Sequence, residues 1–169
     1  METAILLTGL AGVLETDAPV IFAVIGETLS ERDGVSNLSV NGTILLTAMI
    51  GFAVGYSTNS LLLGFLAGAA VGAFVAGIVA FASITLKQSQ VAVGFVLTLM
   101  CRDLAYFLGN PFMGLSGPRV PSTPIPLLSQ IPVLGQLFFS HTVTVYASFF
   151  LIGVAFWWVF KTKPGLMLQ

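Results

Sequence analysis

Residues 61–86 read LLLGFLAGAAVGAFVAGIVAFASITL, and this stretch decides the class of fold. It holds no charged side chain and exceeds the ~20 apolar residues with which an α-helix crosses the hydrocarbon core of a membrane. Gly64, Gly68 and Gly72 recur every four residues, so one face of the predicted helix is nearly smooth and another helix can approach it closely. Two interpretations of this face stay open. It packs against a helix of the same subunit, or it borders a moving translocation path.

The composition of the whole chain extends this interpretation. Of 169 residues, 56% are hydrophobic and 8% charged, with a mean hydropathy of +1.00, whereas soluble domains carry roughly 25% charged residues. Six Lys and Arg against seven Asp and Glu leave no basic surface for nucleic acid. A single cysteine, Cys101, excludes an internal disulfide and a cysteine-based zinc site. We expect an all-α integral membrane protein, a polytopic helical bundle with about five membrane helices.

Other apolar stretches predict the remaining helices. Residues 3–14 are too few to cross a membrane and predict an interfacial or partial helix that stops at residues 15–17. Asp17 and Pro19 are typical of a helix start, so the shortest membrane helix is expected over residues 18–30. The other predicted spans are residues 37–56, 91–108 and 142–160.

Residues 111–141 differ from these apolar stretches, because they hold six prolines and cannot propagate a helix. They predict an external loop within a single transmembrane domain of residues 1–169, and residues 127–139 predict a short interfacial or re-entrant segment. Counting passes puts four basic residues on one side of the membrane and one in the loop: Arg32, Lys87, Lys161 and Lys163 against Arg119. The positive-inside rule then makes the first side cytoplasmic and the N-terminus external.

Arg102 and Asp103 are ionisable residues inside a predicted span, where charge is costly. Adjacent helical side chains point about 100° apart, so the two are not expected to neutralise each other directly. Either both reach the headgroups at the outer interface, or they line the outer half of a pore.

No motif indicates chemistry on a substrate. The cluster of Glu27, Glu31, Arg32 and Asp33 lacks a nucleophile and predicts a charged cytoplasmic turn. None of the lysines follows the glycines of a P-loop, so another subunit must hydrolyse ATP if transport uses it. We expect no enzymatic activity, no cofactor and no metal site.

Several ordered segments resemble the permease subunits of bacterial ABC importers for simple sugars and nucleosides. They are GETLSERDGVSNL at residues 26–38, Gln90-Val91 with Gly94, PIPLL at 124–128, IPVLG at 131–135, and Thr162 with Gly165-Leu166. The resemblance runs over residues 18–169 and implies a multi-pass protein of the bacterial plasma (inner) membrane. It also implies three kinds of partner, namely cytoplasmic ABC ATPase subunits, a second permease subunit and an external substrate-binding lipoprotein, besides membrane lipid.

The family pattern continues beyond Gln169 into a cytoplasmic coupling segment, so the resemblance implies the N-terminal half of a permease. The family usually has Glu where Asn41 stands and Asn where Thr98 stands, and both departures bear on the polar lining of the pathway. Basic residues are usual at the positions of Met167 and Gln169, and their absence weakens the expected ATPase contact.

The start of the predicted span at residues 37–42 is unusually polar, with two asparagines, Ser39 and a glycine. It suits a broken helix start whose backbone groups face a cavity and serve a neutral polyhydroxylated ligand. The candidate pathway residues are Asn37, Asn41, Thr98, Arg102 and Asp103. The predicted function is translocation of a nucleoside or simple sugar as an ABC permease subunit; the alternatives are a self-contained secondary transporter and a small structural membrane protein.

Overall fold

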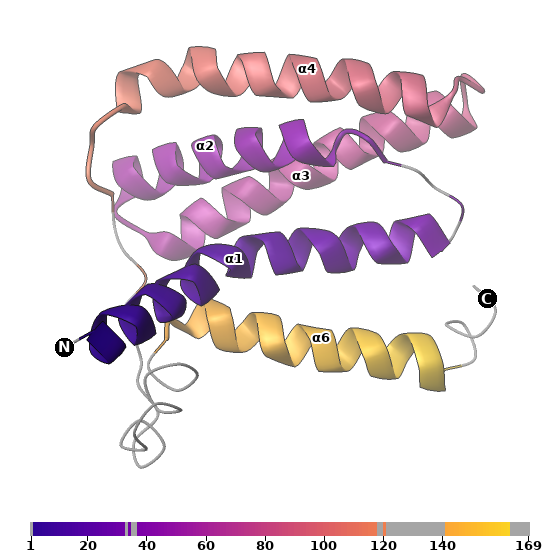
Figure 1. The fold of residues 1–169 in the computed structure, drawn as a ribbon. Helices are drawn as coiled ribbons and strands as arrows, with labels where there is room; N and C mark the ends of the chain where they lie inside the picture. The colour runs from indigo at the N-terminus through magenta and orange to yellow at the C-terminus, as the bar shows by residue number, and fades with distance from the viewer. Residues whose placement is uncertain (1, 33, 35–36, 118–119, 121–140, 163–169) are drawn as a thin grey trace. The chain divides into compact units, whose positions relative to one another are not determined.

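The computed structural model describes residues 2–32, 34, 37–117, 120 and 141–162, and every element there is helical (Figure 1). The elements are α1 (Glu2–Arg32), α2 (Val40–Thr58), α3 (Leu61–Ile84), α4 (Gln90–Gly109), the 3₁₀ turn η1 (Asn110–Phe112) and α6 (Val143–Lys161). The chain divides into two compact units. Unit 1 comprises Met1–Thr28 and Val120–Gln169, and unit 2 comprises Leu29–Arg119.

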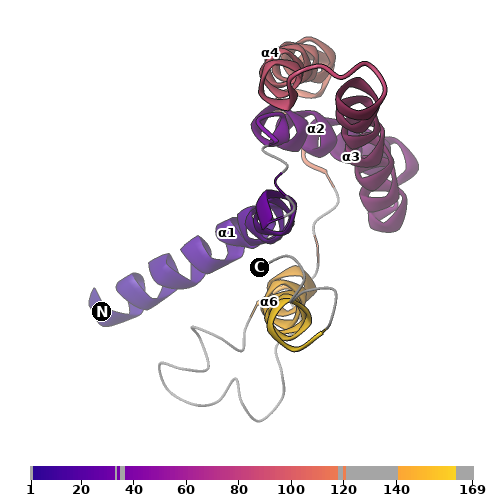
Figure 2. The ribbon, with the colours of Figure 1, turned by 90° about the vertical axis from the view of Figure 1, so that its right-hand side faces the viewer.

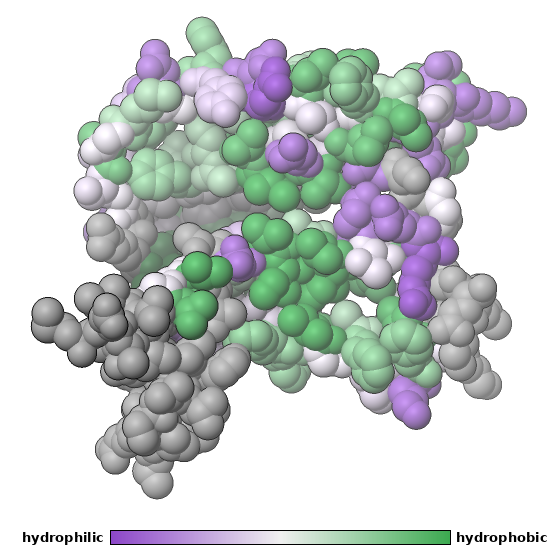
Figure 3. All heavy atoms as spheres, viewed as in Figure 1, coloured by the Kyte–Doolittle hydropathy of each residue, from purple (hydrophilic) through white to green (hydrophobic). Residues whose placement is uncertain are grey.

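Four of the described helices are long and apolar enough to cross a membrane. They are α2, α3, α4 with its 3₁₀ extension to Phe112, and α6. Large apolar side chains cover much of their exposed surface, as the space-filling view shows (Figure 3). Phe74, Phe107 and Phe150 are each at least 70% exposed, which suits a surface that meets lipid or other membrane helices. The all-α polytopic fold is confirmed.

Unit 2 is built around α2, which packs against both α3 and α4 (Figures 1 and 2). Its core consists of six small or medium side chains from the three helices: Leu46, Val75, Val79, Leu97, Cys101 and Ala105. The spacing on α4, with Gly94, Leu97, Cys101 and Ala105 buried, is that of a single helix face. The opposite face of α4 stays outside this core.

A tight turn joins α2 to α3. Asn59 ends α2 with a left-handed backbone, φ 50°, and Ser60 begins α3 by accepting a hydrogen bond from the Leu63 amide at 3.5 Å. Asparagine tolerates the left-handed region better than most residues, and serine is a favoured N-cap. The predicted polar turn between these two spans is thus a helix stop followed directly by a helix start.

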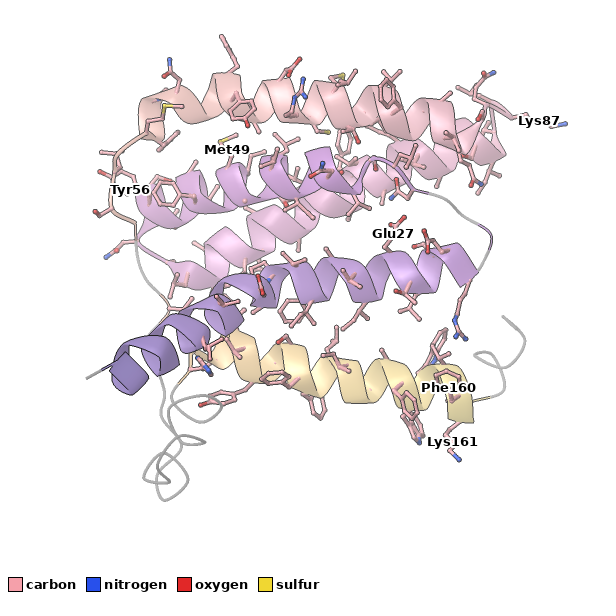
Figure 4. All side chains as sticks on the ribbon, viewed as in Figure 1. Glu27, Met49, Tyr56, Lys87, Phe160 and Lys161 are labelled. Carbon is pink, nitrogen blue, oxygen red and sulfur yellow. The ribbon has the colours of Figure 1, made fainter. Side chains whose placement is uncertain are left out.

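The far end of α2 carries an aromatic cluster. The rings of Phe52, Tyr56 and Phe112 have centroids 6.1 to 6.4 Å apart, stacked within α2 and edge-on to η1. Gly117 lies directly on the Phe52 ring, so the chain that leaves η1 folds back over α2. Figure 4 shows Tyr56 and Lys87 at opposite ends of unit 2.

The prediction for the N-terminal region is wrong. In place of a partial helix, a break at residues 15–17 and a short span, α1 runs without interruption through 31 residues and is the longest described helix. Asp17 caps nothing, because the helix continues on both sides of it. Pro19 lies inside the helix and removes one backbone hydrogen bond; interior prolines bend helices rather than always ending them. α1 changes direction along its length (Figure 2).

In unit 1, α6 begins two residues after His141 and ends in an aromatic and basic segment. The His141 amide donates to the Tyr146 hydroxyl at 3.1 Å, and Ser148 is fully buried with its hydroxyl bonded to the Val145 carbonyl at 2.7 Å. Phe156 and Phe160 pack with ring centroids 4.8 Å apart just before Lys161 (Figure 4). Aromatic rings followed by lysine are typical of a helix end at a membrane interface. The interfacial segment predicted at residues 127–139 lies outside the described residues.

Candidate functional site

The polar start of α2 is the most unusual feature of unit 2. Residues 37–39 are not helical, and α2 begins at Val40. The Asn37 side-chain oxygen accepts hydrogen bonds from the Ser39 amide at 3.1 Å and from the Ser39 hydroxyl at 2.6 Å. Ser39, which is 1% exposed, therefore holds a turn and makes no side-chain bond to the first amides of α2, although serine at this position commonly does.

This turn is fixed to α4 by a hydrogen bond from a distant part of the sequence. The Thr98 hydroxyl donates to the Leu38 carbonyl, across a separation of 60 residues. Gly94 and Thr98 lie about 6 Å and 12 Å from the start of α4 at a rise of 1.5 Å per residue. The non-helical segment thus lies beside the first half of a spanning helix. A backbone without helical bonds is tolerated at such depth where protein or water satisfies it.

Two glycines make the approach possible. A Cβ atom at Gly42 would lie 2.7 Å from the Thr98 Cα, and one at Gly94 would lie 3.0 Å from the Leu38 backbone nitrogen. The first distance is too short for a real Cβ atom and the second is tighter than most real Cβ contacts, so α4 meets the start of α2 and the turn before it backbone against backbone. Neither glycine was among the predicted site residues. Isolated glycines inside apolar helices often mark such close approaches, and that signal was available for both.

The predicted pathway residues occupy different environments. Asn37 is engaged with Ser39, and Thr98 is engaged with Leu38. Asn41 is exposed on the first turn of α2, and its side chain makes no hydrogen bond to the described residues. Its carboxamide can donate and accept, which suits hydroxyl-bearing ligands. The structure therefore places Asn37 in a turn that Thr98 of α4 supports, with Asn41 next to it.

Arg102 and Asp103 form an ion pair, contrary to the expectation that they would not neutralise each other. The Arg102 Nε lies 3.1 Å from the Asp103 Oδ1, because the long arginine side chain reaches around the helix to its neighbour. Their side chains are 46% and 70% exposed. Asp103 is about 200° around α4 from the buried Cys101, at roughly 100° per residue. The structure thus does not bring Asp103 to the face of α4 that meets α2.

The small-residue face of α3 lies on α2. Cβ atoms built at Gly64 and Gly68 would lie 2.7 Å from the Gly51 carbonyl oxygen and 3.3 Å from the Thr47 carbonyl oxygen. One at Gly72 would lie 3.6 Å from the Thr47 methyl group, an ordinary contact. The approach is therefore closest at Gly64 and relaxes along α3.

Among the described residues, no three His, Cys, Asp or Glu side chains gather as metal ligands would. What the polar segment offers is amide, hydroxyl and carbonyl groups beside a spanning helix, without a formal charge between Asn37 and Thr43. Such groups can hydrogen-bond a neutral solute. Four apolar helices and this internal polar segment define a multi-pass helical membrane protein.

Comparison with known proteins identifies the family within that class. The chain belongs to the family described as "Branched-chain amino acid transport system / permease component", whose model matches residues 9–169. A putative glucose ABC transporter permease protein, TsgC13 of Haloferax volcanii, is 33% identical over 150 residues, which cover 86% of this chain and 46% of the relative.

Two further relatives are named for nucleosides. The nucleoside ABC transporter permease protein NupC of Lactococcus lactis is 30% identical over 170 residues. The match covers 94% of this chain and 54% of the NupC chain. The guanosine ABC transporter permease protein NupQ of Bacillus subtilis is 31% identical over 166 residues. The match covers 90% of this chain and 51% of the NupQ chain. The chain thus spans about half the length of these relatives. No solved structure matches it.

Proposed function

We propose that this chain is part of the membrane-spanning permease of an ABC importer that translocates a nucleoside or a simple sugar. The observation that carries the proposal is the uncharged polar turn at the start of α2, held against α4 inside a spanning bundle. Nucleosides and sugars are neutral and rich in hydroxyl groups, so amides and hydroxyls recognise them better than charges do. The relatives named for glucose, nucleoside and guanosine transport support the same substrate class.

In this proposal Asn41 contacts the solute, and Asn37 and Thr98 hold the turn that presents it. Asp103 lies on another face of α4 and is not part of this wall, and Arg102 is engaged with it in an ion pair. The contact of Gly64, Gly68 and Gly72 with α2 keeps the supporting helices fixed. No chemistry on the solute is proposed, and transport is the whole activity.

The proposed partners are those of an ABC importer: cytoplasmic ATPase subunits, a second permease subunit and an external substrate-binding lipoprotein. The given sequence holds no P-loop, and in this proposal a separate subunit hydrolyses the ATP. In the proposed topology the Lys87 and Lys161 ends are cytoplasmic and the proline-rich residues 111–141 are external, within one transmembrane domain.

Uptake in cells that lack the chromosomal permease tests the proposal. The complete permease should restore uptake of radiolabelled nucleosides or sugars, and this uptake should stop when ATP is depleted but survive a protonophore. Asn41→Leu should lower uptake about tenfold or more, because an apolar group replaces both hydrogen-bonding atoms, and Asn41→Gln should retain part of it. Ser57→Ala, at the exposed end of α2, is the matched control and should leave uptake unchanged. Uptake driven by an ion gradient without ATP would favour the secondary transporter instead.

A further inference from the structure

The aromatic cluster at the end of α2 is not part of the polar wall proposed above. Phe52 and Tyr56 stack within α2 with ring planes 15° apart, and Phe112 of η1 meets both rings edge-on. Offset stacks and edge-to-face contacts are the arrangements that aromatic rings favour. The three rings therefore form one ordered unit at this end of α2.

Phe52 is held in place by more than its neighbouring rings. A Cβ atom at Gly117 would lie 3.1 Å or less from three atoms of the Phe52 ring, so only the bare backbone of a glycine fits there. One turn earlier in α2, Gly109 of α4 closely approaches the Met49 side chain, which a Cβ atom at Gly109 would meet at 3.2 Å. A ring fixed in this way supports a ligand without first losing conformational freedom.

Tyr56 is the most open ring of the cluster. Within unit 2 it is 43% exposed, whereas Phe52 and Phe112 are half-buried. Its hydroxyl group makes no hydrogen bond to the described residues. Tyr56 therefore has ring surface and a hydroxyl group left for a ligand.

Tyr56 also lies on the same face of α2 as Asn41. This face consists of positions 41, 45, 48, 52 and 56, which recur at intervals of three or four residues and include no charge. The contacts of α2 with α3 and α4 use other positions, such as Gly51 toward α3 and Gly42 toward α4. A solute that moves along this face from Tyr56 meets Asn41 after about 22 Å, at 1.5 Å per residue.

We propose that Tyr56, supported by Phe52 and Phe112, is a subsite on which the base of a nucleoside stacks before the solute reaches Asn41. The inference rests on the proposed function and selects the nucleoside from its two substrate classes. Every nucleobase has a π-face, so stacking on an aromatic side chain accepts purines and pyrimidines alike. A simple sugar has hydroxyl groups for Asn41 but no aromatic ring for Tyr56. The pathway thus has two successive subsites, one aromatic and one amide.

Uptake by the complete permease, with its ATPase and external binding protein, tests the aromatic subsite. At saturating external nucleoside, the rate reports passage through the membrane protein. Tyr56→Leu should lower this rate about tenfold, because base stacking is lost, whereas Tyr56→Phe keeps the ring and should retain most of the rate. Phe107→Leu replaces a ring that is 76% exposed near the end of α4, and this matched control should leave the rate unchanged.

Three outcomes would overturn the inference, and they differ in what they leave standing. Equal rates for the Tyr56→Leu and Tyr56→Phe variants would show that the ring does not receive the solute. ATP-dependent uptake of simple sugars without uptake of any nucleoside would overturn the inference and leave the proposed function intact. A complete permease that takes up neither class of solute with ATP would contradict the proposed function itself, and the inference with it.

A spectroscopic measurement keeps an aromatic ring at this position, in case the leucine variant fails to insert. Tyr56→Trp places an indole in the cluster, and a base stacked on it should quench its fluorescence. Adenosine and ribose differ by the base, so we expect adenosine to quench this emission in the purified complete permease and ribose to leave it unchanged. The unchanged protein gives the background from its own tryptophans, which include Trp157 and Trp158. Absence of quenching by adenosine, or equal quenching by ribose or in a Phe107→Trp control, would overturn the inference.

Discussion

The glycines on α3 differ in what surrounds them. This difference predicts how much each replacement lowers the free energy of unfolding. Gly64→Ala puts a methyl group 2.7 Å from the Gly51 carbonyl oxygen and 3.3 Å from the Gly55 Cα, both backbone atoms that cannot turn aside. The helices must separate, so we expect a loss of about 2–3 kcal/mol in the free energy of unfolding. Thermal unfolding in detergent measures it.

Gly77 provides the control on the same helix, since a Cβ there would meet nothing within 4 Å. Gly77→Ala should be neutral or stabilise by up to about 1 kcal/mol, because alanine restricts the unfolded chain and favours helix. If Gly64→Ala and Gly77→Ala behave alike, the close contact between α2 and α3 is not present in the protein.

The residue that ends α2 makes a second prediction at this scale. Asn59 adopts φ 50°, a conformation that costs most side chains about 1–2 kcal/mol. Asn59→Ala should therefore lower the free energy of unfolding by about 1 kcal/mol, and Asn59→Gly should leave it almost unchanged, because glycine has no Cβ. Urea or thermal unfolding of the two variants distinguishes them. An alanine variant as stable as the glycine variant would show that the turn is not left-handed.

Among the elements, the start of α2 depends on α4 more than on its own sequence. The segment before Val40 has no side-chain cap on α2, and its Leu38 carbonyl is held by Thr98. Thr98→Val keeps the shape of the side chain and removes the donor, which leaves the carbonyl without its partner. We expect a loss of about 1 kcal/mol and faster hydrogen exchange in the first turn of α2. Thr98→Ser keeps the hydroxyl and should restore slow exchange.

Thr47→Val is the matched control for this hydrogen bond. Thr47 lies in the same helix that Thr98 holds, but its hydroxyl bonds only the Ile44 carbonyl of its own helix at 3.1 Å. Its replacement should leave exchange at residues 38–43 unchanged. Equal effects of the two valine variants would mean that Thr98 does not hold the turn.

The sequence predicts some of these elements and not others, for identifiable reasons. Apolar runs bounded by polar turns locate α2, α3, α4 and α6 to within a few residues, because crossing a membrane requires a long uncharged helix. The same rule misplaced α1. Its carboxylates at residues 15 and 17 and Pro19 suggested a helix boundary. A carboxylate costs a helix little, however, and an interior proline can bend a helix without ending it.

The polar turn before α2 shows a second limit of prediction from sequence. Its composition was visible at residues 37–42, but the hydrogen bond from Thr98 joins residues 60 positions apart, and no local pattern encodes such a contact. The ion pair of Arg102 and Asp103 was missed for a different reason. Helical angles describe where side chains start, whereas a long flexible arginine can reach its neighbour around the helix.

On the scale of the whole molecule, the orientation of unit 2 in the membrane follows from its two ends. α3 is 24 residues long, about 36 Å at 1.5 Å per residue, so Thr58 just before it and Lys87 just after it must lie on opposite sides of a membrane that it spans. Basic residues are usually retained on the cytoplasmic side, so we expect Lys87 there. We then expect the aromatic cluster of Phe52, Tyr56 and Phe112, at the opposite end of unit 2, to be external.

Cysteine labelling in intact cells tests this orientation. In a Cys101→Ala background, a Thr58→Cys variant should react with a maleimide that cannot cross membranes, and a Lys87→Cys variant should react only after the cells are opened. Both positions are exposed, so access to the reagent depends on the side of the membrane and not on burial. Labelling of both variants in intact cells would mean that α3 does not cross. Labelling of the Lys87→Cys variant alone would invert the whole topology, since turning α3 around also turns the helices packed on it.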